Sequence, residues 1–222
     1  IFQEPSRSFD PLQNMASVFY ETIKNSNPKI SKAEALKIAE ELLEETGITN
    51  AKERLSNFPH QFSGGQLQRI SIALSLAQGC ELLIADEPTT ALDVTIQNQI
   101  VQLLKKLQQE KNLSIIFISH NIDLVAEISD NIIVMYGGLI MEKGETKSVL
   151  ENPQHPYTQG LLKASPKFGS HYADEKLFSI PGKVIEPTIQ IEGCPFAPRC
   201  NSENKSVECE SKNFVKKVCY GK

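Results

Sequence analysis

The chain has 222 residues, of which 40% are hydrophobic and 23% are charged, and its formal net charge is −4. This composition suits a globular protein with a buried core, and the acidic balance gives no electrostatic footprint for nucleic-acid binding. No apolar run approaches the roughly 18 residues that a membrane span needs, and no signal peptide is expected. Any membrane role is therefore expected to come through a partner.

The first predicted elements are helical. Residues 6–30 are rich in Ser, Asn and Pro, which predicts a loop or a short helix. A capping box formed by Ser31 and Glu34 then begins an amphipathic helix, and Gly47 lies where a glycine that ends a helix belongs.

Two short apolar runs, residues 81–86 and 113–119, predict buried strands. The other predicted elements are three helices and one hairpin: residues 66–78, 95–112 and 121–129, and a hairpin over 130–144 that turns at Gly137-Gly138. Buried strands that alternate with helices indicate an α/β fold with a largely parallel sheet.

The pattern changes near residue 150, because prolines interrupt it and no long periodic helix follows. The prolines concerned are Pro153, Pro156, Pro166, Pro181, Pro187, Pro195 and Pro198. We therefore expect one domain over residues 1–150 and a C-terminal extension over residues 151–222.

Asp86 and Glu87 stand at the C-terminal tip of the strand predicted over residues 81–86. Ligands of open α/β sheets bind at this edge. An aspartate so placed in P-loop nucleotide hydrolases helps to hold Mg²⁺, and an adjacent glutamate could polarise an attacking water as a general base. The alternative is a pair of solvated acids after a strand.

The stretch FSGGQ, residues 62–66, leads into the helix predicted over residues 66–78. Backbone N–H groups and the positive end of a helix make a site for anions, and glycines let a phosphate come close. Taken alone, SGG is better explained as an ordinary Ser N-cap with a flexible entry.

Five short motifs follow one another along the chain: IFQEP, FSGGQ, LLIADEP, TALD and ISH. On these motifs, residues 1 to about 145 resemble the nucleotide-binding subunit of ATP-binding cassette (ABC) transporters. The resemblance implies a partial P-loop NTPase core of the ABC type, whose helical subdomain, at about residues 8–80, carries the signature motif. A small irregular extension that contains cysteines would follow this core.

The resemblance also implies roles for single residues near the phosphates of ATP. Gln3 would be the Q-loop glutamine, which senses nucleotide and joins Asp86 in serving Mg²⁺. Glu87 would act on the attacking water, and His120 would be the switch histidine near the γ-phosphate.

Two further roles follow from the same resemblance, both at the interface of two ATPase subunits. Ser63, Gly64, Gly65 and Gln66 would form the signature motif, which meets the γ-phosphate of ATP held by the opposite subunit. Asp93 would belong to the D-loop, which crosses the dimer interface.

ABC ATPases need a phosphate-binding loop, G-x-x-x-x-G-K-[ST], upstream of the Q-loop. The sequence has two Gly-Lys pairs, Gly182-Lys183 and Gly221-Lys222, and neither fits this motif. We therefore expect the chain to be a fragment that is inactive alone, although the intact subunit would hydrolyse ATP. The alternative is a non-catalytic interaction fragment.

The stretch NPQHPYTQGLLKASP, with IPGKVIEP and GCPFAPRC after it, resembles the segment that follows the ATPase core in oligopeptide and dipeptide importers. The resemblance implies an ATPase that energises peptide uptake from the cytoplasmic face of the membrane. Its partners would be transmembrane permease subunits, a second ABC ATPase subunit (identical or different) and, indirectly, an extracytoplasmic peptide-binding protein. Nickel or another small solute is the alternative cargo.

Five cysteines are spread unevenly. Cys80 stands in an apolar neighbourhood, where a buried small hydrophobe is expected. Cys194, Cys200, Cys209 and Cys219 are crowded into the tail, which favours a metal site, but their spacing is not that of a zinc ribbon or of the common ferredoxin runs. The family resemblance points to a [4Fe–4S] cluster, with Zn²⁺ and unligated or disulfide-bonded thiols as alternatives.

Overall fold

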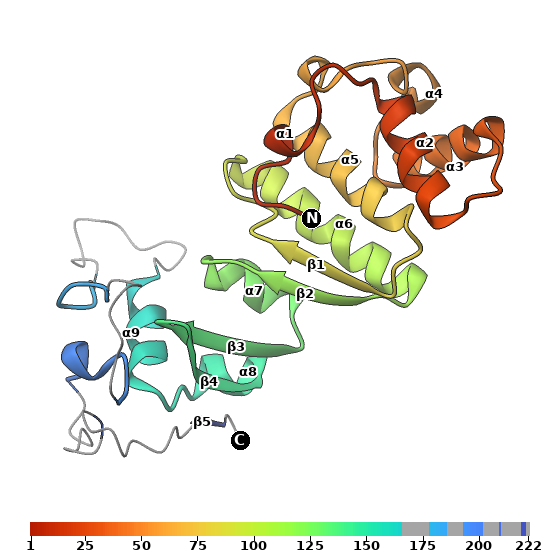
Figure 1. The fold of residues 1–222 in the computed structure, drawn as a ribbon. Helices are drawn as coiled ribbons and strands as arrows, with labels where there is room; N and C mark the ends of the chain where they lie inside the picture. Colours follow the sequence, from red (N-terminus) through yellow and green to blue (C-terminus); the bar gives the residue numbers. More distant parts are fainter. Residues whose placement is uncertain (166–177, 186–192, 202–208, 210–218, 221–222) are drawn as a thin grey trace. The chain divides into compact units, whose positions relative to one another are not determined.

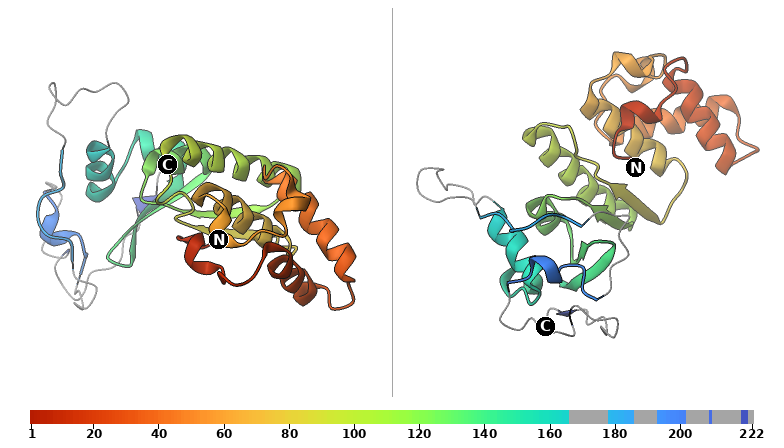
Figure 2. Two further views of the ribbon diagram at one scale, coloured as in Figure 1. Left: turned by 90° about the horizontal axis from the view of Figure 1, so that it is seen from above. Right: turned by 60° about the vertical axis from the view of Figure 1, so that its left-hand side comes forward.

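The computed structural model describes residues 1–165, 178–185, 193–201, 209 and 219–220 (Figures 1 and 2). The chain divides into two compact units, Ile1–Leu124 and Val125–Lys222. The domain boundary near residue 150 stays a prediction. Among the described residues, no helix combines the length and the apolar character needed to cross a bilayer.

The first unit combines a group of helices with a small parallel sheet. Its helices are α1 (Pro5–Ser8), α2 (Met15–Ser26), α3 (Lys32–Glu45), α4 (Ala51–Arg54), the 3₁₀ turn η1 (Pro59–Gln61), α5 (Gly64–Leu76) and α6 (Val94–Lys111). Its strands are β1 (Leu82–Asp86) and β2 (Ser114–Ile118), and α7 (Ile122–Ile128) spans the division between the units in sequence.

The expectation of a loop or short helix over residues 6–30 agrees with α1 and the loop after it, but residues 15–26 form the longer, 12-residue helix α2. The Asn14 side chain accepts a hydrogen bond from the Ser17 N–H and begins the helix. Met15, Phe19 and Ile23 recur every four residues and are all buried. Burial of this stripe outweighs the polar composition of the segment.

The capping box predicted for α3 is confirmed, because Ser31 and Glu34 exchange side-chain and backbone hydrogen bonds. Gly47 follows the helix at φ 82°, a left-handed conformation in which glycine is unstrained. Leu42 and Leu43 are among the residues that α3 buries.

β1 and β2 pair in parallel, with Leu82 opposite Ser114 and Asp86 opposite Ile118 (Figure 1). On the other side of β1, the Ile1 N–H group donates to the Ile84 carbonyl, and the Asp86 N–H donates to the Ile1 carbonyl. Residues 1–3 therefore run beside β1 towards its carboxyl end.

The prediction that these strands are buried holds for one face of β1 only, and the corresponding face of β2 is half-buried. Leu83 and Ala85 are buried, whereas Leu82, Ile84, Ile116 and Ile118 are 45–50% exposed. Alternate residues of a strand point to opposite faces, and only one face is covered by residues of this unit. An apolar run in a sequence cannot show which of the two faces is covered.

The second unit is built on a hairpin. β3 (Asn131–Tyr136) pairs antiparallel with β4 (Leu139–Glu145), and β4 pairs in parallel with β5 (Cys219–Tyr220). Gly137 and Gly138 have φ values of 55° and 77°, which confirms the predicted turn and fits its two-residue type. The remaining elements are α8 (Thr146–Glu151), α9 (Pro156–Ala164) and the 3₁₀ turn η2 (Ala197–Arg199).

A small aromatic core holds this second unit together. The Tyr136 ring lies 4.7 Å from the Tyr157 ring and 5.4 Å from the Phe196 ring, measured between centroids. The Arg199 guanidinium donates to the carbonyls of Ile180 and Pro181 and to the Tyr136 hydroxyl. These contacts fasten the described parts of the proline-rich tail to α9 and the hairpin.

Candidate active site

Glu87 lies directly after β1, at the carboxyl end of the parallel pair. Its N–H donates to the carbonyl of Ile118, the last residue of β2, at 2.9 Å. Its φ is 44°, in the left-handed region that residues other than glycine rarely adopt. Such conformations cluster at functional sites and persist because the surrounding contacts hold them.

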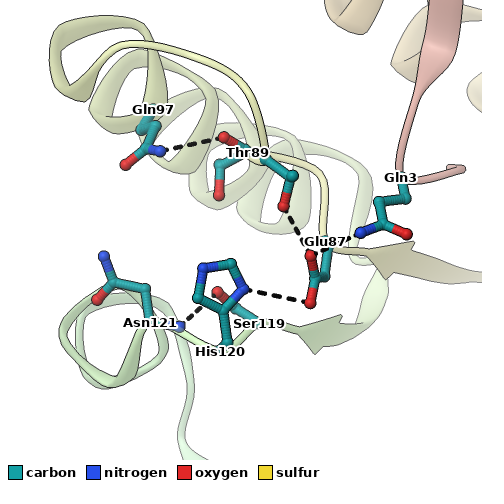
Figure 3. A network of polar contacts seen from close by, with 8 residues as sticks. Gln3, Glu87, Thr89, Gln97, Ser119, His120 and Asn121 are labelled. Carbon is teal, nitrogen blue, oxygen red and sulfur yellow. Dashed lines mark hydrogen bonds and ion pairs between the residues drawn. The ribbon is translucent and has the colours of Figure 1, made fainter.

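The Glu87 carboxylate accepts hydrogen bonds from three side chains (Figure 3). Oε2 accepts from Gln3 Nε2 at 2.9 Å and from Thr90 Oγ1 at 2.7 Å. Oε1 lies 3.2 Å from Nδ1 of His120. Residues far apart in the sequence therefore meet at one carboxylate, and three of them, Gln3, Glu87 and His120, are candidates from the motifs.

These contacts also set the ionisation of Glu87. The hydrogen bonds from Thr90 and His120 hold the pKa of the Glu87 carboxyl below its ordinary value. The carboxylate is therefore ionised at neutral pH, which is the form that a general base needs.

Two other candidates at this edge are open to solvent. Asp86 is exposed at the end of β1, and the His120 side chain is 74% exposed. His120 lies between β2 and α7, in a loop where the Ser119 hydroxyl accepts from the Asn121 N–H (Figure 3). Both side chains can be reached by a ligand at the carboxyl edge of the sheet.

The loop between Glu87 and α6 is fastened at several points. Gln97 Nε2 donates to the carbonyls of Thr89 and Leu92, each at 3.1 Å. Asp93 begins α6 as its N-cap, and its side chain accepts from the Ile96 N–H. Asp93 thus has a structural task within this unit, and its role across a dimer interface stays a prediction.

The predicted signature motif begins helix α5. Ser63 is the N-cap, and it forms a capping box with Gln66: the Ser63 hydroxyl accepts from the Gln66 N–H, and the Gln66 side chain accepts from the Ser63 N–H. The ordinary capping role weighed from the sequence is therefore present. It is compatible with an anion site, because other N–H groups of the first turn have no partner within the helix.

The first turn of α5 packs against the loop and helix that follow Glu87. A Cβ placed on Gly64 would lie 3.6 Å from a methyl group of Leu92. A Cβ placed on Gly65 would lie only 2.8 Å from Cγ2 of Ile96. The second glycine of the motif is thus needed for close packing on α6, apart from any role towards a phosphate.

We expect Gly65→Ala to lower the free energy of unfolding by about 1–3 kcal/mol, because Ile96 Cγ2 is close to the backbone and cannot swing away. Urea denaturation of the 222-residue chain measures the change. Ile96→Ala removes the clashing methyl, so Gly65→Ala should cost much less in that background. An equal cost in both backgrounds would show that the two residues do not interact.

Sequence reasoning missed the contributions of Thr90 and Gln97. Thr90 stands three residues after Glu87, a spacing that a turn brings together, and the Thr90 N–H donates to the Glu87 carbonyl. Gln97 lies in the first turn of α6, where a long amide side chain can reach back to preceding carbonyls. Either contact requires the particular backbone path of residues 87–92.

Of the cysteines in the described residues, Cys80 is half-buried rather than buried, since its thiol donates to the Ser75 carbonyl. Cys194 and Cys200 are half-buried against the aromatic core, and the Cys194 N–H donates to the Cys209 carbonyl at 2.7 Å. Within the part of the chain that the structure describes, no group of three His, Cys, Asp or Glu could hold a metal ion. The Cys219 side chain, together with Pro166 and Pro187, lies outside the described residues.

Two protein families match different segments of the chain. Residues 2–90 match the family described as ABC transporter. Residues 141–209 match the family described as Oligopeptide/dipeptide transporter, C-terminal region. The chain thus carries an ABC transporter domain followed by an oligopeptide/dipeptide transporter C-terminal region.

Curated relatives of this ABC protein agree. It is 45% identical over 205 residues to a "Putative peptide import ATP-binding protein" of Brucella melitensis, covering 90% of this chain and 60% of the relative. It is 46% identical over 199 residues to the "Oligopeptide transport ATP-binding protein OppD" of Bacillus subtilis, covering 90% and 55%. The ABC protein described here thus spans somewhat more than half the length of these relatives.

Solved structures support the fold. An ATP-binding cassette, MJ0796, "bound to ADP and Pi" in a dimeric post-hydrolysis state, superposes with a TM-score of 0.57 at 30% identity, covering 66% of this chain and 61% of that one. CbiO1 of Clostridium perfringens, described as part of the ABC transporter complex CbiONQ, gives a TM-score of 0.58 at 31% identity, covering 68% and 58%. The α/β fold with a partial ABC-type core is confirmed.

Proposed function

We propose that this chain is part of an ATP-hydrolysing subunit that energises peptide uptake through an ABC importer. The observation that carries the proposal is the carboxylate of Glu87 at the carboxyl edge of β1 and β2, with Gln3 and His120 bonded to it. Phosphoryl transfer to water needs a base, a phosphate contact and a metal ligand held close together. This edge supplies side chains for all three.

Each residue has a distinct task in this proposal. Glu87 accepts a proton from the water that attacks the γ-phosphate of ATP. His120 donates to that phosphate, and Ser63 with the N–H groups of Gly64 and Gly65 contacts the γ-phosphate bound by the opposite subunit. Asp93 belongs to the interface between the two subunits.

Mg²⁺ is the metal of this reaction, and it would bind between Asp86 and the phosphates. The exposed Asp86 carboxylate and the amide oxygen of Gln3 are hard oxygen ligands, which suit Mg²⁺ together with phosphate oxygens and waters. Bound there, the ion neutralises charge that develops on the phosphates. The side chains present therefore fit the ion.

The proposed cargo is a peptide, because the curated relatives are named for peptide, dipeptide or oligopeptide transport. The subunit would work at the cytoplasmic face of the membrane with permease subunits and a second ATPase subunit. An extracytoplasmic peptide-binding protein would deliver the cargo. Nickel uptake is the alternative that a transport assay separates.

A chimera tests this function. The N-terminal part of Bacillus subtilis OppD, up to the position that aligns with Ile1, is joined to this chain, which supplies a phosphate-binding loop upstream of Gln3. We expect the purified chimera to hydrolyse ATP with Mg²⁺, and to restore uptake of labelled oligopeptides in cells that lack OppD. A folded chimera that binds and hydrolyses no ATP would instead support a non-catalytic interaction role.

We further propose that Cys194, Cys200, Cys209 and Cys219 bind a metal centre, for which the family resemblance favours [4Fe–4S] over Zn²⁺. The proximity of Cys194 and Cys209 supports this, because the Cys194 N–H donates to the Cys209 carbonyl at 2.7 Å. A bound centre would tie the tail to the aromatic core and stabilise a segment that is poor in helix and strand.

Purification without oxygen tests the metal centre. We expect brown protein with equal amounts of iron and sulfide, and Cys200→Ser should remove most of both. Cys80→Ser is the matched control, because Cys80 lies in the other unit, and it should leave the metal content unchanged. Zinc in place of iron would support a metal centre but contradict the [4Fe–4S] cluster. Protein without metal would contradict both.

A further inference from the structure

The three donors to Glu87 differ in how firmly each is held. Gln3 is exposed on the segment beside β1, and the His120 side chain is largely exposed in the loop after β2. Thr90 is half-buried and lies in the same short turn as Glu87. Its bond to the carboxylate is also the shortest of the three, at 2.7 Å.

The turn that carries Thr90 is fixed on both sides. The Thr90 N–H donates to the Glu87 carbonyl at 3.1 Å, which closes the turn. The Gln97 side chain donates to the Thr89 carbonyl (Figure 3). It also donates to the Leu92 carbonyl, so both residues that flank the Thr90-Ala91 pair are held. Ala91 adopts φ 63°, so the chain path here is set by these contacts rather than by the preference of the residue.

When nucleotide is bound, the three donors to Glu87 are expected to differ in whether they also contact a ligand. In the proposed function, the Gln3 amide oxygen also binds Mg²⁺ and His120 also donates to the γ-phosphate. Gln3 and His120 are therefore each shared between Glu87 and a ligand. Thr90 has no such second task, so its hydroxyl serves the carboxylate alone.

We propose that Thr90 is a positioning residue whose hydroxyl holds the Glu87 carboxylate in the orientation needed to accept a proton from the attacking water. The inference rests on the proposed function. The Thr90 hydrogen bond to Oε2 fixes one oxygen and leaves Oε1, the oxygen that faces His120, to accept the proton. Thr90 itself does not contact the nucleotide in this proposal.

The test compares Thr90→Val with Thr90→Ser in the ATP-hydrolysing chimera. Valine keeps the shape and removes the hydroxyl, so we expect kcat to fall about 10- to 100-fold, the usual effect of a hydrogen bond to a charged group. KM and the affinity for MgATP should not change, and Thr90→Ser should restore the parental kcat. Thr95→Val is the control, because Thr95 is exposed on the first turn of α6.

A double-mutant cycle separates positioning from general damage. If Thr90 acts through Glu87, then Thr90→Val has no further effect on single-turnover hydrolysis once Glu87→Gln is present. Full activity of Thr90→Val in an active chimera would overturn the inference, and so would a parallel loss of MgATP affinity or of thermal stability. An inactive parent chimera would contradict the proposed function instead.

Discussion

In the ATP-hydrolysing chimera, Glu87→Gln is expected to lower kcat by about 10²- to 10⁴-fold, the range typical of a lost general base. Glutamine has the same size and can still accept from Thr90 and face His120. It cannot take a proton from water. The fold of the site and the affinity for MgATP should therefore be retained while hydrolysis is lost.

The matched control is Glu81→Gln, the same change at an exposed glutamate just before the amino end of β1. It should leave both turnover and MgATP binding unchanged. Hydrolysis by Glu87→Gln at the parental rate would mean that Glu87 is a solvated acid. A loss of MgATP binding in Glu87→Gln would mean that the carboxylate serves to bind nucleotide rather than to activate water.

The grouping of Gln3, Glu87 and His120 could be predicted from the resemblance of the motifs to ABC ATPases, whereas the predicted strand end alone pointed only to Asp86 and Glu87. Each candidate follows an apolar run, and the carboxyl ends of parallel strands meet at one edge. The contacts among them could not be predicted. They depend on the φ of 44° at Glu87, which turns its carboxylate towards Gln3 and Thr90. A glutamate at this position does not predict a left-handed backbone conformation.

Helix α2 shows a different limit. Its buried residues, Met15, Phe19 and Ile23, have helical spacing, but Ser17 and Thr22 between them have weak helix propensity. Packing against other helices decides the outcome, and propensity alone does not report it. The strands that contain Ile84 and Ile116 show the same limit. Their apolar runs predict burial, but the sequence does not show which face neighbouring elements cover.

Glu142→Ala is expected to lower the free energy of unfolding of the second unit by about 2–5 kcal/mol, since each hydrogen bond to a charged group contributes about 1.5–3 kcal/mol. Glu142 lies in β4 and is 0% exposed. Its Oε1 accepts from the Gln154 N–H at 2.8 Å, and its Oε2 accepts from the His155 N–H at 3.1 Å. Alanine removes both acceptors from a buried position in β4.

The consequence should extend to the aromatic core, because the loop that Glu142 holds leads directly into α9. His155 begins α9 and accepts from the Tyr157 N–H at 3.1 Å, and the Tyr157 ring lies 5.3 Å from the Phe196 ring. Amide hydrogen exchange over residues 152–160 should therefore accelerate in Glu142→Ala, together with an earlier loss of tyrosine signal in urea. Glu142→Gln, which keeps one acceptor, should fall between this variant and the parent.

Glu145→Ala is the matched control, because Glu145 ends the same strand but is exposed and makes no side-chain cap to α8. A surface change of this kind is expected to alter stability by no more than about 0.5 kcal/mol. Equal effects of Glu142→Ala and Glu145→Ala would show that the hydrogen bonds from the Gln154 and His155 N–H groups to the Glu142 carboxylate do not contribute to stability. A large effect of Glu142→Ala alone would identify this buried carboxylate as the group that joins the His-Pro-Tyr segment to the hairpin.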